Sequence, residues 1–322
     1  LFITLSNLGD IILTTPVLGR LHKEFPGAYI DVITGAPGKE IFMPHPAVRK
    51  VTVHVKRRSI GGRLREVMAI RGEKYDMVVD LKNTLIPYLA GAKYHTRVFI
   101  PVWPGMRSAR NNGIHKRDEH LAKLSHMGMD ISAPADFFMP SGDTEKKFID
   151  GILAAAGGEK TVVIAPGAKS HLKRWPARKY AMLANRLVAE FGCRVYLTGD
   201  AADKKVIEEV AGHTAAGTVS DICCKTSVSA LGELMRRSDL VITNDSAPLH
   251  VASAVNTPTV AVFGPSDEKK YGPLAGRSRV IKPRVPCRPC GKALCSPGPD
   301  EGCITLIGVD EVFEAAREIL GG

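Results

Sequence analysis

Short runs of consecutive apolar residues alternate along the chain with segments whose apolar residues recur at helical spacing. The apolar runs are rich in Val, Ile, Leu and Thr and predict strands, whereas the amphipathic segments predict helices. Strands are expected at 1–5, 29–34, 50–53, 77–81, 97–100, 161–165, 194–198, 240–243 and 259–263, and helices at 11–24, 60–71, 178–191, 202–210, 230–237 and 249–254. Apolar strands separated by helices are typical of parallel sheets that are covered on both faces. The pattern therefore predicts an α/β protein.

The length of the chain predicts two domains. A chain of 322 residues exceeds what one compact core usually holds, and two domains of about 150 residues each are the natural expectation. The rhythm of strands and helices starts again after the small residues Ala-Ala-Ala-Gly-Gly at 154–158, which suit a linker or hinge. We therefore expect two Rossmann-like doubly wound domains, residues 1–157 and 158–322, facing each other across a cleft, with the last helix a candidate to pack back on the first domain.

Composition narrows the class of protein. The chain is 44% hydrophobic and 24% charged, as in ordinary globular proteins, and it contains no apolar run long enough to span a membrane. Its opening segment is apolar but lacks a basic region and carries Asp10, which disfavours a secretory signal. The 44 Lys and Arg against 33 Asp and Glu leave a net charge of +11, which favours an anionic partner: a nucleic acid, a lipid surface or a phosphorylated substrate.

Asp10 is the first candidate for chemistry. Ligands of open parallel sheets bind outside the carboxyl ends of the strands, where loops lead into helices. Asp10 follows the first predicted strand by a short loop, Ser6-Asn7-Leu8-Gly9, and stands at the start of a predicted helix. A carboxylate at this position can cap the helix, or it can act as a general base. The residue pattern leaves both roles open.

The stretch VITNDSAPLHVASAV holds a second candidate site. An apolar strand ends at Thr243, and Pro248 suits the first turn of the helix that follows. The backbone N–H groups of such a helix start can bind a phosphate, and Asp245 beside them is better suited to sugar hydroxyls than to the phosphate itself. His250 follows on the same helical turn and is either a hydrogen-bond donor or a packed core histidine.

Basic residues follow another predicted strand, in APGAKSHLKRWP. Lys169, Lys173 and Arg174 precede Trp175, which we expect to anchor the loop. Cations at this place can neutralise a pyrophosphate leaving group without a metal ion, although a solvated basic loop is the simpler interpretation. In the neighbouring stretch YLTGDAADKK, Asp203 could bond a ribose, and Asp200 is a close rival for that role.

Four motifs in register resemble one family. The segments LSNLGDIILTTPVL, PGAKSHLKRWP, NDSAPLHVASA and TPTVAVFGPSDEKKYGP are similar in order and spacing to those of the ADP-heptose:lipopolysaccharide heptosyltransferases, glycosyltransferase family 9. The resemblance covers essentially the whole chain. It implies a GT-B fold, a nucleotide-sugar donor held mainly by the C-terminal domain, and an inverting, metal-independent transfer of heptose to the inner core of lipopolysaccharide. The chain also has no D-x-D motif of the kind that holds a divalent cation.

The resemblance also implies roles for single residues. Asp10 matches the catalytic base, Lys173 matches the lysine that binds the donor phosphates, with Arg174 assisting, and Asp245 matches the carboxylate that holds the donor sugar. Asp203 matches the acid that binds the ribose. The helix start beneath the diphosphate corresponds to Ser246, Ala247, Leu249 and His250, although the family often has Gly where this chain has Ala247 followed by Pro248.

Many of the Lys and Arg residues that make the net charge positive lie in two clusters of the N-terminal domain. Their members assigned to acceptor binding are Arg57, Arg58, Arg63, Arg107 and Arg110. A solvated surface would explain them, and so would a lipid A acceptor that carries phosphates and acidic Kdo sugars at the cytoplasmic face of the inner membrane. Nucleic acid is disfavoured, because aromatic residues make up only 6% of the chain and do not interleave with the charges.

The seven cysteines raise a separate question. Cys287, Cys290, Cys295 and Cys303 follow the spacing C-x2-C-x4-C-x7-C, which offers four thiolates to a structural zinc but is not the spacing of a standard zinc ribbon. Disulfides are improbable in a reducing cytoplasm. We expect Cys193, Cys223 and Cys224 to be buried small apolar residues. No cofactor is expected for catalysis.

Two other functions fit the same residues. The framework could transfer another nucleotide-activated sugar to a different acceptor, or the chain could be a non-catalytic nucleotide-sugar-binding relative. Retention of Asp10 argues against the second of these.

Overall fold

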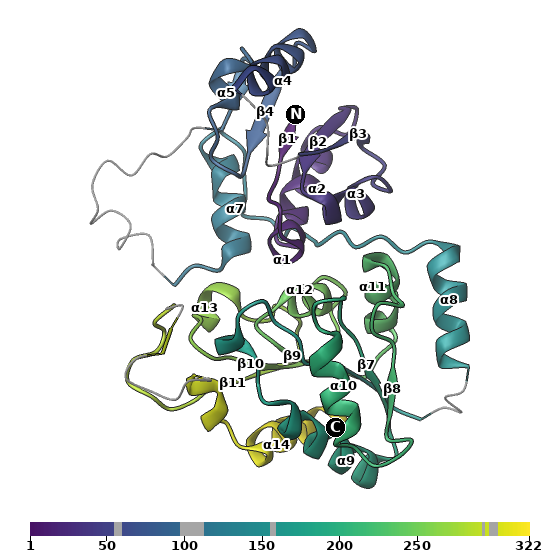
Figure 1. The fold of residues 1–322 in the computed structure, drawn as a ribbon. Helices are drawn as coiled ribbons and strands as arrows, with labels where there is room; N and C mark the ends of the chain where they lie inside the picture. The colour runs from purple at the N-terminus through teal and green to yellow at the C-terminus, as the bar shows by residue number, and fades with distance from the viewer. Residues whose placement is uncertain (55–59, 97–112, 155–158, 292–293, 296–301) are drawn as a thin grey trace. The chain divides into compact units, whose positions relative to one another are not determined.

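A computed structural model describes residues 1–54, 60–96, 113–154, 159–291, 294–295 and 302–322. The chain divides into two compact units, Leu1–Pro140 and Ser141–Gly322 (Figure 1). Within the described ranges, no helix combines the length and the apolar character needed to cross a bilayer.

The first unit is built on a parallel sheet with the strand order β3-β2-β1-β4-β5. Both neighbours of β1 pair with it in parallel, so that Phe2 lies opposite Val32 on one side and Val79 on the other. The strands are β1 Phe2–Ile3, β2 Ile30–Thr34, β3 Val48–Val53, β4 Met77–Asp80 and β5 Tyr94–His95. The helices are α1 Leu8–Ile12, α2 Thr15–Glu24, α3 Ala36–Phe42, α4 Ile60–Gly72, α5 Ile86–Leu89 and α7 Lys116–Ser125.

The helix expected at 11–24 is two helices, α1 and α2. Pro16 lies in the first turn of α2 and has no N–H to donate to the carbonyl of Ile12. The hydroxyl of Thr15 donates to that carbonyl instead, at 2.9 Å, and the hydroxyl of Thr14 donates to the carbonyl of Ile11 at 2.6 Å. Threonine side chains thus replace the missing backbone bonds at the break. The strand expected at 97–100 falls outside the described residues.

The second unit has a longer parallel sheet, with the order β11-β10-β9-β6-β7-β8. Its strands are β6 Thr161–Ala165, β7 Arg194–Leu197, β8 Val219–Asp221, β9 Leu240–Asn244, β10 Thr259–Val262 and β11 Ser278–Ile281. Its helices are α8 Asp143–Leu153, α9 Ala177–Phe191, α10 Lys204–Gly212, α11 Val228–Arg236, α12 Ala247–Ala254, α13 Glu268–Tyr271 and α14 Val309–Leu320, with the 3-10 helices η1 His171–Lys173 and η2 Cys303–Leu306.

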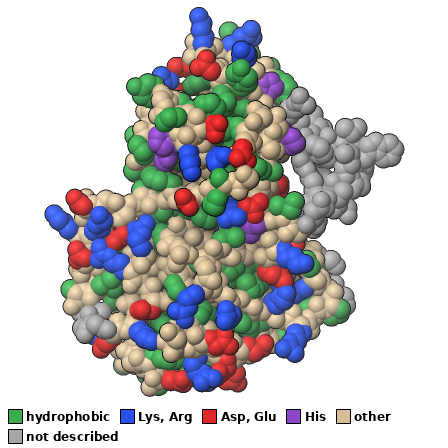
Figure 2. Space-filling model, turned by 180° about the vertical axis from the view of Figure 1, so that it is seen from behind, with side chains coloured by type: hydrophobic (Ala, Val, Ile, Leu, Met, Phe, Trp, Pro, Cys, Tyr) green, Lys and Arg blue, Asp and Glu red, His purple; other side chains and the backbone are tan. Residues whose placement is uncertain are grey.

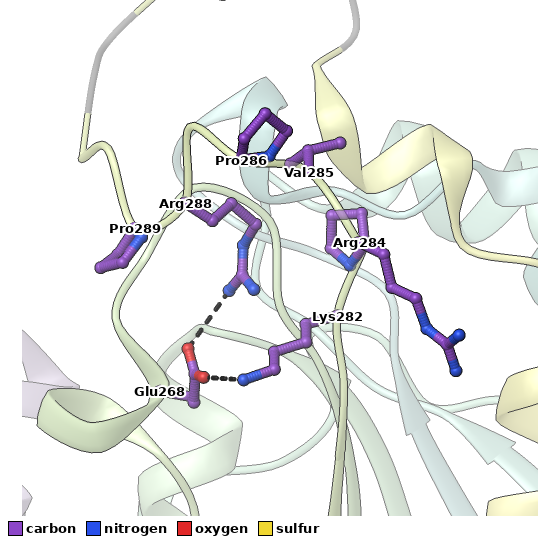
Figure 3. A pocket seen from close by; sticks show the side chains of 8 residues that line it. Glu268, Lys282, Arg284, Val285, Pro286, Arg288 and Pro289 are labelled. Atoms are coloured by element: carbon purple, nitrogen blue, oxygen red, sulfur yellow. Dashed lines mark hydrogen bonds and ion pairs between the residues drawn. The ribbon is translucent and has the colours of Figure 1, made fainter.

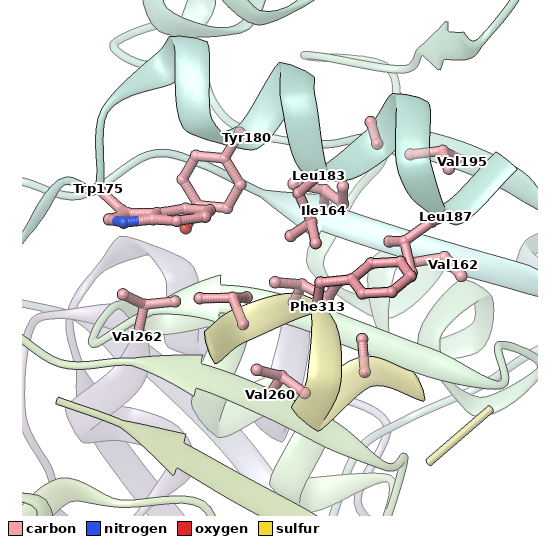
Figure 4. Close-up of a cluster of buried hydrophobic side chains, with 14 of the residues drawn as sticks. Val162, Ile164, Trp175, Tyr180, Leu183, Leu187, Val195, Val260, Val262 and Phe313 are labelled. Atoms are coloured by element: carbon pink, nitrogen blue, oxygen red, sulfur yellow. The ribbon is translucent and has the colours of Figure 1, made fainter. Parts of the chain in front are cut away.

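The core of the second unit lies between its sheet and two helices, α9 and α14 (Figure 4). Val162 and Ile164 of β6 are fully buried there, and Phe313 reaches the same cluster from α14. The rings of Trp175 and Tyr180 pack edge to face with their centroids 4.9 Å apart. The last helix therefore belongs to the core of the second unit, which corrects the expectation that it packs back on the first.

The boundary between the units also differs from the expected one after residue 157. Helix α8 was assigned to the first domain, but it packs against α11 and belongs to the second unit, which begins at Ser141. Ile149 of α8 is fully buried, and the carboxylate of Asp150 accepts a hydrogen bond from Arg237 at 2.5 Å. The small-residue stretch at 154–158 lies mostly outside the described residues. Because it follows α8, which already belongs to the second unit, it does not mark the boundary.

Candidate functional site

In the first unit, the candidate site is the loop between β1 and α1, at the carboxyl edge of the sheet. Asn7 is the N-cap residue of α1, and Asp10 lies in the first turn of the helix. The amide of Asn7 donates a hydrogen bond to Oδ2 of Asp10 at 3.2 Å, while Asp10 stays half exposed. A carboxylate in this position is held by its own loop and is still accessible to a substrate hydroxyl. The N-cap position thus belongs to Asn7 and not to Asp10, whose carboxylate in the first turn is favourable for the helix dipole and leaves the role of a base open.

The β1–α1 loop is pressed against the end of β2. The amide of Gly35 donates to the carbonyl of Leu5 at 3.0 Å. A Cβ at position 35 would lie 2.5 Å from the backbone oxygen of Ser6, a distance that real Cβ atoms do not tolerate. Gly35 therefore allows the loop that carries Asp10 to lie directly on the neighbouring strand end.

On the other side of β1, the end of β4 forms a tight polar turn that the sequence analysis did not single out. Asp80 is 2% exposed, and its carboxylate accepts hydrogen bonds from the amides of Lys82 and Thr84 and from the hydroxyl of Thr84. Lys123 of α7 donates to the carbonyls of Asp80 and Leu81 and to the side chain of Asn83, at 2.8–3.2 Å. The carboxyl ends of β1, β2 and β4 thus form one polar platform around the Asp10 loop.

In the second unit, the end of β9 is organised by Asn244, a second residue that the sequence analysis passed over. Asn244 is fully buried, and its side-chain amide donates to the carbonyl of Pro166 at 2.7 Å. Its side-chain oxygen accepts from the backbone amide of Trp175 at 3.1 Å and from the hydroxyl of Tyr180 at 2.9 Å. Asn244 therefore fixes the basic loop after β6 to the end of β9.

This arrangement brings Lys173 and Asp245 together. The ammonium of Lys173, in η1, lies 2.6 Å from Oδ2 of Asp245, and the two side chains are 33% and 5% exposed. A nearly buried carboxylate beside a cation that is still partly open can receive both a sugar hydroxyl and a phosphate oxygen. Arg174 instead donates to the carbonyl of Ala168 at 2.7 Å and stabilises its own loop.

Helix α12 begins immediately after Asp245, with Ser246 as its N-cap residue and proline in its first turn. The proline at 248 offers no N–H, and the amide of Leu249 already donates to the carbonyl of Ser246 at 3.1 Å. The side chain of Leu249 packs in a core cluster with Phe263, and His250 is 6% exposed. We therefore expect the amides of Ser246 and Ala247 to do most of the anion binding, with Leu249 and His250 supporting the helix.

Asp203 lies at the start of α10 and points back toward two strand ends. A Cβ at Gly167, after β6, would lie 2.1 Å from the carboxylate of Asp203, and one at Gly199, after β7, would lie 2.7 Å from its Cβ. Burial raises the pKa of Asp203, and the positive charge of Arg174 partly opposes that effect. The carboxylate of Asp200, by contrast, accepts from the amide of Ala202 in its own turn. The packing favours Asp203 over Asp200 as the acid that faces the edge of the sheet.

A pocket of about 400 Å³ lies elsewhere on the same edge, after β11 (Figure 3). Glu268 forms ion pairs there with Lys282 and, at 3.4 Å, with Arg288. Arg288 also donates to the carbonyls of Gly264 and Ser266. These charges are paired with one another, and they lie two strands away from β9 in the sheet order. We therefore interpret the ion pairs that line the pocket as structural contacts that hold the loop after β11 in place.

The four late cysteines were a candidate for a structural zinc site. In the part of the chain that the structure describes, no three His, Cys, Asp or Glu side chains are grouped as ligands of a metal ion. All four thiols are free, with Cys303 buried and Cys287 exposed, and the other three lie near enough to Cys303 to raise its pKa slightly, although burial is the larger cause. The expectation for the other three cysteines holds only for Cys193. Cys223 is partly exposed and Cys224 is exposed, because they lie in the turn after β8.

The basic clusters assigned to acceptor binding cannot be placed. Arg57, Arg58, Arg107 and Arg110 lie outside the described residues, and so does the side chain of Arg63 in α4. On the face seen in Figure 2, basic side chains are mixed with acidic ones over the surface. The described surface on that face therefore does not gather the net positive charge into one patch.

Comparison with known proteins identifies the family. A sequence profile of glycosyltransferase family 9 (heptosyltransferase) matches residues 129–299, more than half of the chain. The chain is 28% identical over 308 residues to lipopolysaccharide heptosyltransferase 2 of Escherichia coli strain K12, a match that covers 86% of each protein.

Two solved structures share the fold. The structure of a family 9 glycosyl transferase from Veillonella parvula aligns with a TM-score of 0.84 and 23% identity, covering 99% of this chain and 96% of that one. The structure of the E. coli ADP-heptose lps heptosyltransferase II aligns with a TM-score of 0.74 and 23% identity, covering 99% and 98%. The chain thus belongs to glycosyltransferase family 9, the heptosyltransferases, and is a glycosyltransferase with two Rossmann-like domains in the GT-B fold.

Proposed function

We propose that this protein transfers heptose from ADP-heptose to a sugar of the lipopolysaccharide inner core, with inversion at the anomeric carbon and without a metal ion. The observation that carries the proposal is the Lys173–Asp245 pair at the start of α12, a cation and a carboxylate 2.6 Å apart beside the N-terminal end of the helix. A nucleotide-sugar donor needs both kinds of group within a few ångströms. The two Escherichia coli relatives, which are named as lipopolysaccharide heptosyltransferases, support this choice of donor and acceptor.

The donor would lie along the carboxyl edge of the second sheet. Lys173 and the amides of Ser246 and Ala247 would hold the diphosphate, and Asp245 would accept hydrogen bonds from heptose hydroxyls. Asp203, which faces Gly167 and Gly199, would bond the ribose. The positive end of α12 and the Lys173 ammonium would stabilise the negative charge that develops on the departing ADP, which is the task a divalent cation performs in other transferases.

The acceptor would lie on the polar platform of the first unit. Asp10 would take the proton of the acceptor hydroxyl as that oxygen bonds to the anomeric carbon of the heptose. The bond between that carbon and the phosphate oxygen breaks on the opposite face, and ADP leaves with the electron pair. One proton passes to Asp10, and the configuration of the anomeric carbon inverts.

We also propose that the protein works at the cytoplasmic face of the inner membrane, as a peripheral protein. Its acceptor is a lipid, and the net charge of +11 favours an anionic surface. The arginines at 57, 58, 63, 107 and 110 remain candidates for contact with acceptor phosphates and acidic sugars.

The decisive experiment is detection by mass spectrometry of a heptosylated product from ADP-heptose and a series of truncated lipid A cores, with and without inner-core heptose, in buffer containing EDTA. Asp10→Ala is expected to reduce turnover by at least a thousandfold while the affinity for ADP-heptose stays within about threefold, since the base belongs to the other unit. Asp76→Ala is the matched control, because Asp76 is an exposed acid immediately before β4, at the opposite edge of the same sheet.

Each alternative predicts a different outcome. Transfer from UDP- or GDP-sugars in preference to ADP-heptose would identify a related transferase with another donor. Tight ADP-heptose binding with no product from any acceptor would favour a non-catalytic binding protein. Loss of all transfer in EDTA, with recovery on adding a divalent metal, would contradict the metal-independent mechanism.

A further inference from the structure

Lys82 is a cation beside the candidate base that neither the motifs nor the family resemblance singled out. It follows β4, and its ammonium lies 3.5 Å from the hydroxyl of Ser6 in the loop that leads to Asp10. In that loop, Asn7 donates to the carboxylate of Asp10. The Lys82 ammonium is therefore directed toward the same short loop that holds Asp10.

The backbone around Lys82 is fixed. Its amide donates to the buried carboxylate of Asp80 at 2.7 Å, and the next residue, Asn83, has a φ of 58°. A left-handed asparagine carries strain, and Lys123 holds it in place by donating to its side-chain oxygen at 2.8 Å. Because the turn is held at both of these points, the stem of Lys82 starts from a defined position.

The Lys82 ammonium has unused hydrogen-bonding capacity. An ammonium carries three donors, but the long contact to Ser6 is its one hydrogen bond or ion pair within the part of the chain that the structure describes. Lys123, on the same platform, already donates to three oxygen atoms. The donors of a half-buried ammonium that only water solvates can be transferred to an anionic ligand, whereas those of Lys123 are already used within the fold.

We propose that Lys82 binds an acidic group of the acceptor, a sugar carboxylate or a phosphate, and thereby positions the neighbouring acceptor hydroxyl at Asp10. This inference rests on the proposed function, since it takes Asp10 as the base and the first unit as the acceptor site. It adds that the acceptor must be anionic close to the hydroxyl that reacts. Lys82 is then a determinant of acceptor specificity.

The test compares Lys82→Met, which removes the charge and keeps the stem, with Lys82→Arg and with Lys50→Met, an exposed lysine of β3. With the truncated lipid A core that the wild type heptosylates as acceptor, Lys82→Met is expected to raise the acceptor KM ten- to a hundredfold, which corresponds to the loss of one charge-assisted hydrogen bond. The KM for ADP-heptose and the melting temperature should stay unchanged. Lys82→Arg should retain most of the acceptor affinity.

Two modified acceptors separate the sources of the negative charge. If the partner is a carboxylate, a carboxyl-reduced acceptor should abolish the difference between the wild type and Lys82→Met; if it is a phosphate, a dephosphorylated acceptor should do so. Equal acceptor KM values for the wild type and Lys82→Met overturn the inference, and so does an equal loss in Lys50→Met.

Calorimetric binding of the core oligosaccharide without a donor keeps the test independent of catalysis. A wild type that makes no product but binds the oligosaccharide at least tenfold more tightly than Lys82→Met contradicts the proposed function and supports the role of Lys82. If the wild type transfers heptose but the wild type and Lys82→Met bind the oligosaccharide equally, the proposed function is supported and the role of Lys82 is contradicted. A wild type that does not bind the oligosaccharide overturns the role of Lys82.

Discussion

At the scale of single residues, the Lys173–Asp245 pair connects stability with function. Asp245 is 5% exposed, and a carboxylate that deep in a protein depends on a partner. In the free protein that partner is Lys173. When a donor binds, a phosphate would compete for the ammonium while sugar hydroxyls take its place on the carboxylate. The pair would therefore exchange one set of partners for another, and the site would never hold an uncompensated charge.

This exchange predicts a difference between a single and a double variant. Lys173→Met should destabilise the second unit by about 1–3 kcal/mol, because it leaves Asp245 unpaired, and it should abolish tight ADP-heptose binding. Lys173→Met with Asp245→Asn should recover most of the stability and none of the turnover. Urea unfolding and initial rates measure the two effects, with Lys205→Met on the exposed face of α10 as the control. A double variant as unstable as the single one would contradict this account.

His120 predicts an acid sensitivity of the first unit. It is 2% exposed on α7, and neither ring nitrogen has a hydrogen-bond partner among the described residues. Burial, together with the nearby charges of Lys116, Lys123 and His115, lowers the pKa of His120 to about 3. An unfolded histidine titrates near pH 6.5, so between about pH 6.5 and pH 3 the unfolded state holds a proton that the folded state lacks. The neutral, buried His120 therefore costs no stability above pH 6.5, and the free energy of unfolding falls as the pH is lowered through this window.

The free energy of unfolding is expected to fall by about 1.4 kcal/mol per pH unit, or roughly 2 kcal/mol between pH 6.5 and pH 5. His120→Leu should remove this part of the pH dependence, and the exposed His126→Leu should leave it in place. Urea unfolding at pH 7 and pH 5 gives the comparison. Identical losses of stability in the wild type and His120→Leu would show that His120 is not the group responsible.

The sequence located some of these residues and missed others for physical reasons. Asp10, Lys173 and Asp245 follow apolar strands, and the rule that ligands lie at carboxyl strand ends points directly to them. Asn244 was not singled out, because nothing local reveals that its side-chain amide group bonds to Pro166 and to Tyr180, 78 and 64 residues away. Contacts of this kind depend on which strands become neighbours, and the sequence pattern leaves strand order open.

At the scale of elements, burial explains several outcomes in the second unit, although the exposed edge strand β3 of the first unit was also predicted, at 50–53. The strand β6 is buried at every position and was predicted with its observed bounds, 161–165. By contrast, β8 and β11 are edge strands of the sheet, and their exposed residues break the apolar pattern, so neither was predicted. The break between α1 and α2 was missed although Pro16 was visible, because the apolar periodicity continues across it. At that point Pro16 indicates the helix break correctly and the apolar periodicity does not.

At the scale of the whole molecule, the proposed mechanism assigns one part of the chemistry to each Rossmann-like unit. The candidate base lies after β1 of the first unit, and the donor groups lie after β6 and β9 of the second. The expectation of two domains was sound, but the boundary was not, because a small-residue stretch is only a local signal. Helix α8 is held in the second unit by polar contacts that the sequence does not display. The hydroxyl of Ser141 donates to Glu233 at 2.7 Å, and Asp150 pairs with Arg237.

The polar contacts around Glu233 show why α8 matters. Burial alone would raise the pKa of Glu233, but hydrogen bonds from Ser141, Arg237 and Arg236 outweigh that effect and lower it. A fragment that begins at residue 158 would remove Ser141 and Asp150 from this network and would uncover the surface against which Ile149 is buried. A fragment that begins at Ser141 keeps all of these contacts.

The two fragments therefore test the boundary and the assignment of the donor site together. Residues 141–322 are expected to fold alone and to bind ADP within about threefold of the full chain, without any transfer, because Asp10 is absent. Residues 158–322 should be less stable by at least about 2 kcal/mol, from one lost buried side chain and two lost polar contacts. Urea unfolding and ADP titration measure both. Equal stability of the two fragments would show that the domain boundary lies at the small-residue stretch 154–158. A folded 141–322 fragment without affinity for ADP would show that the second unit does not contain the nucleotide site.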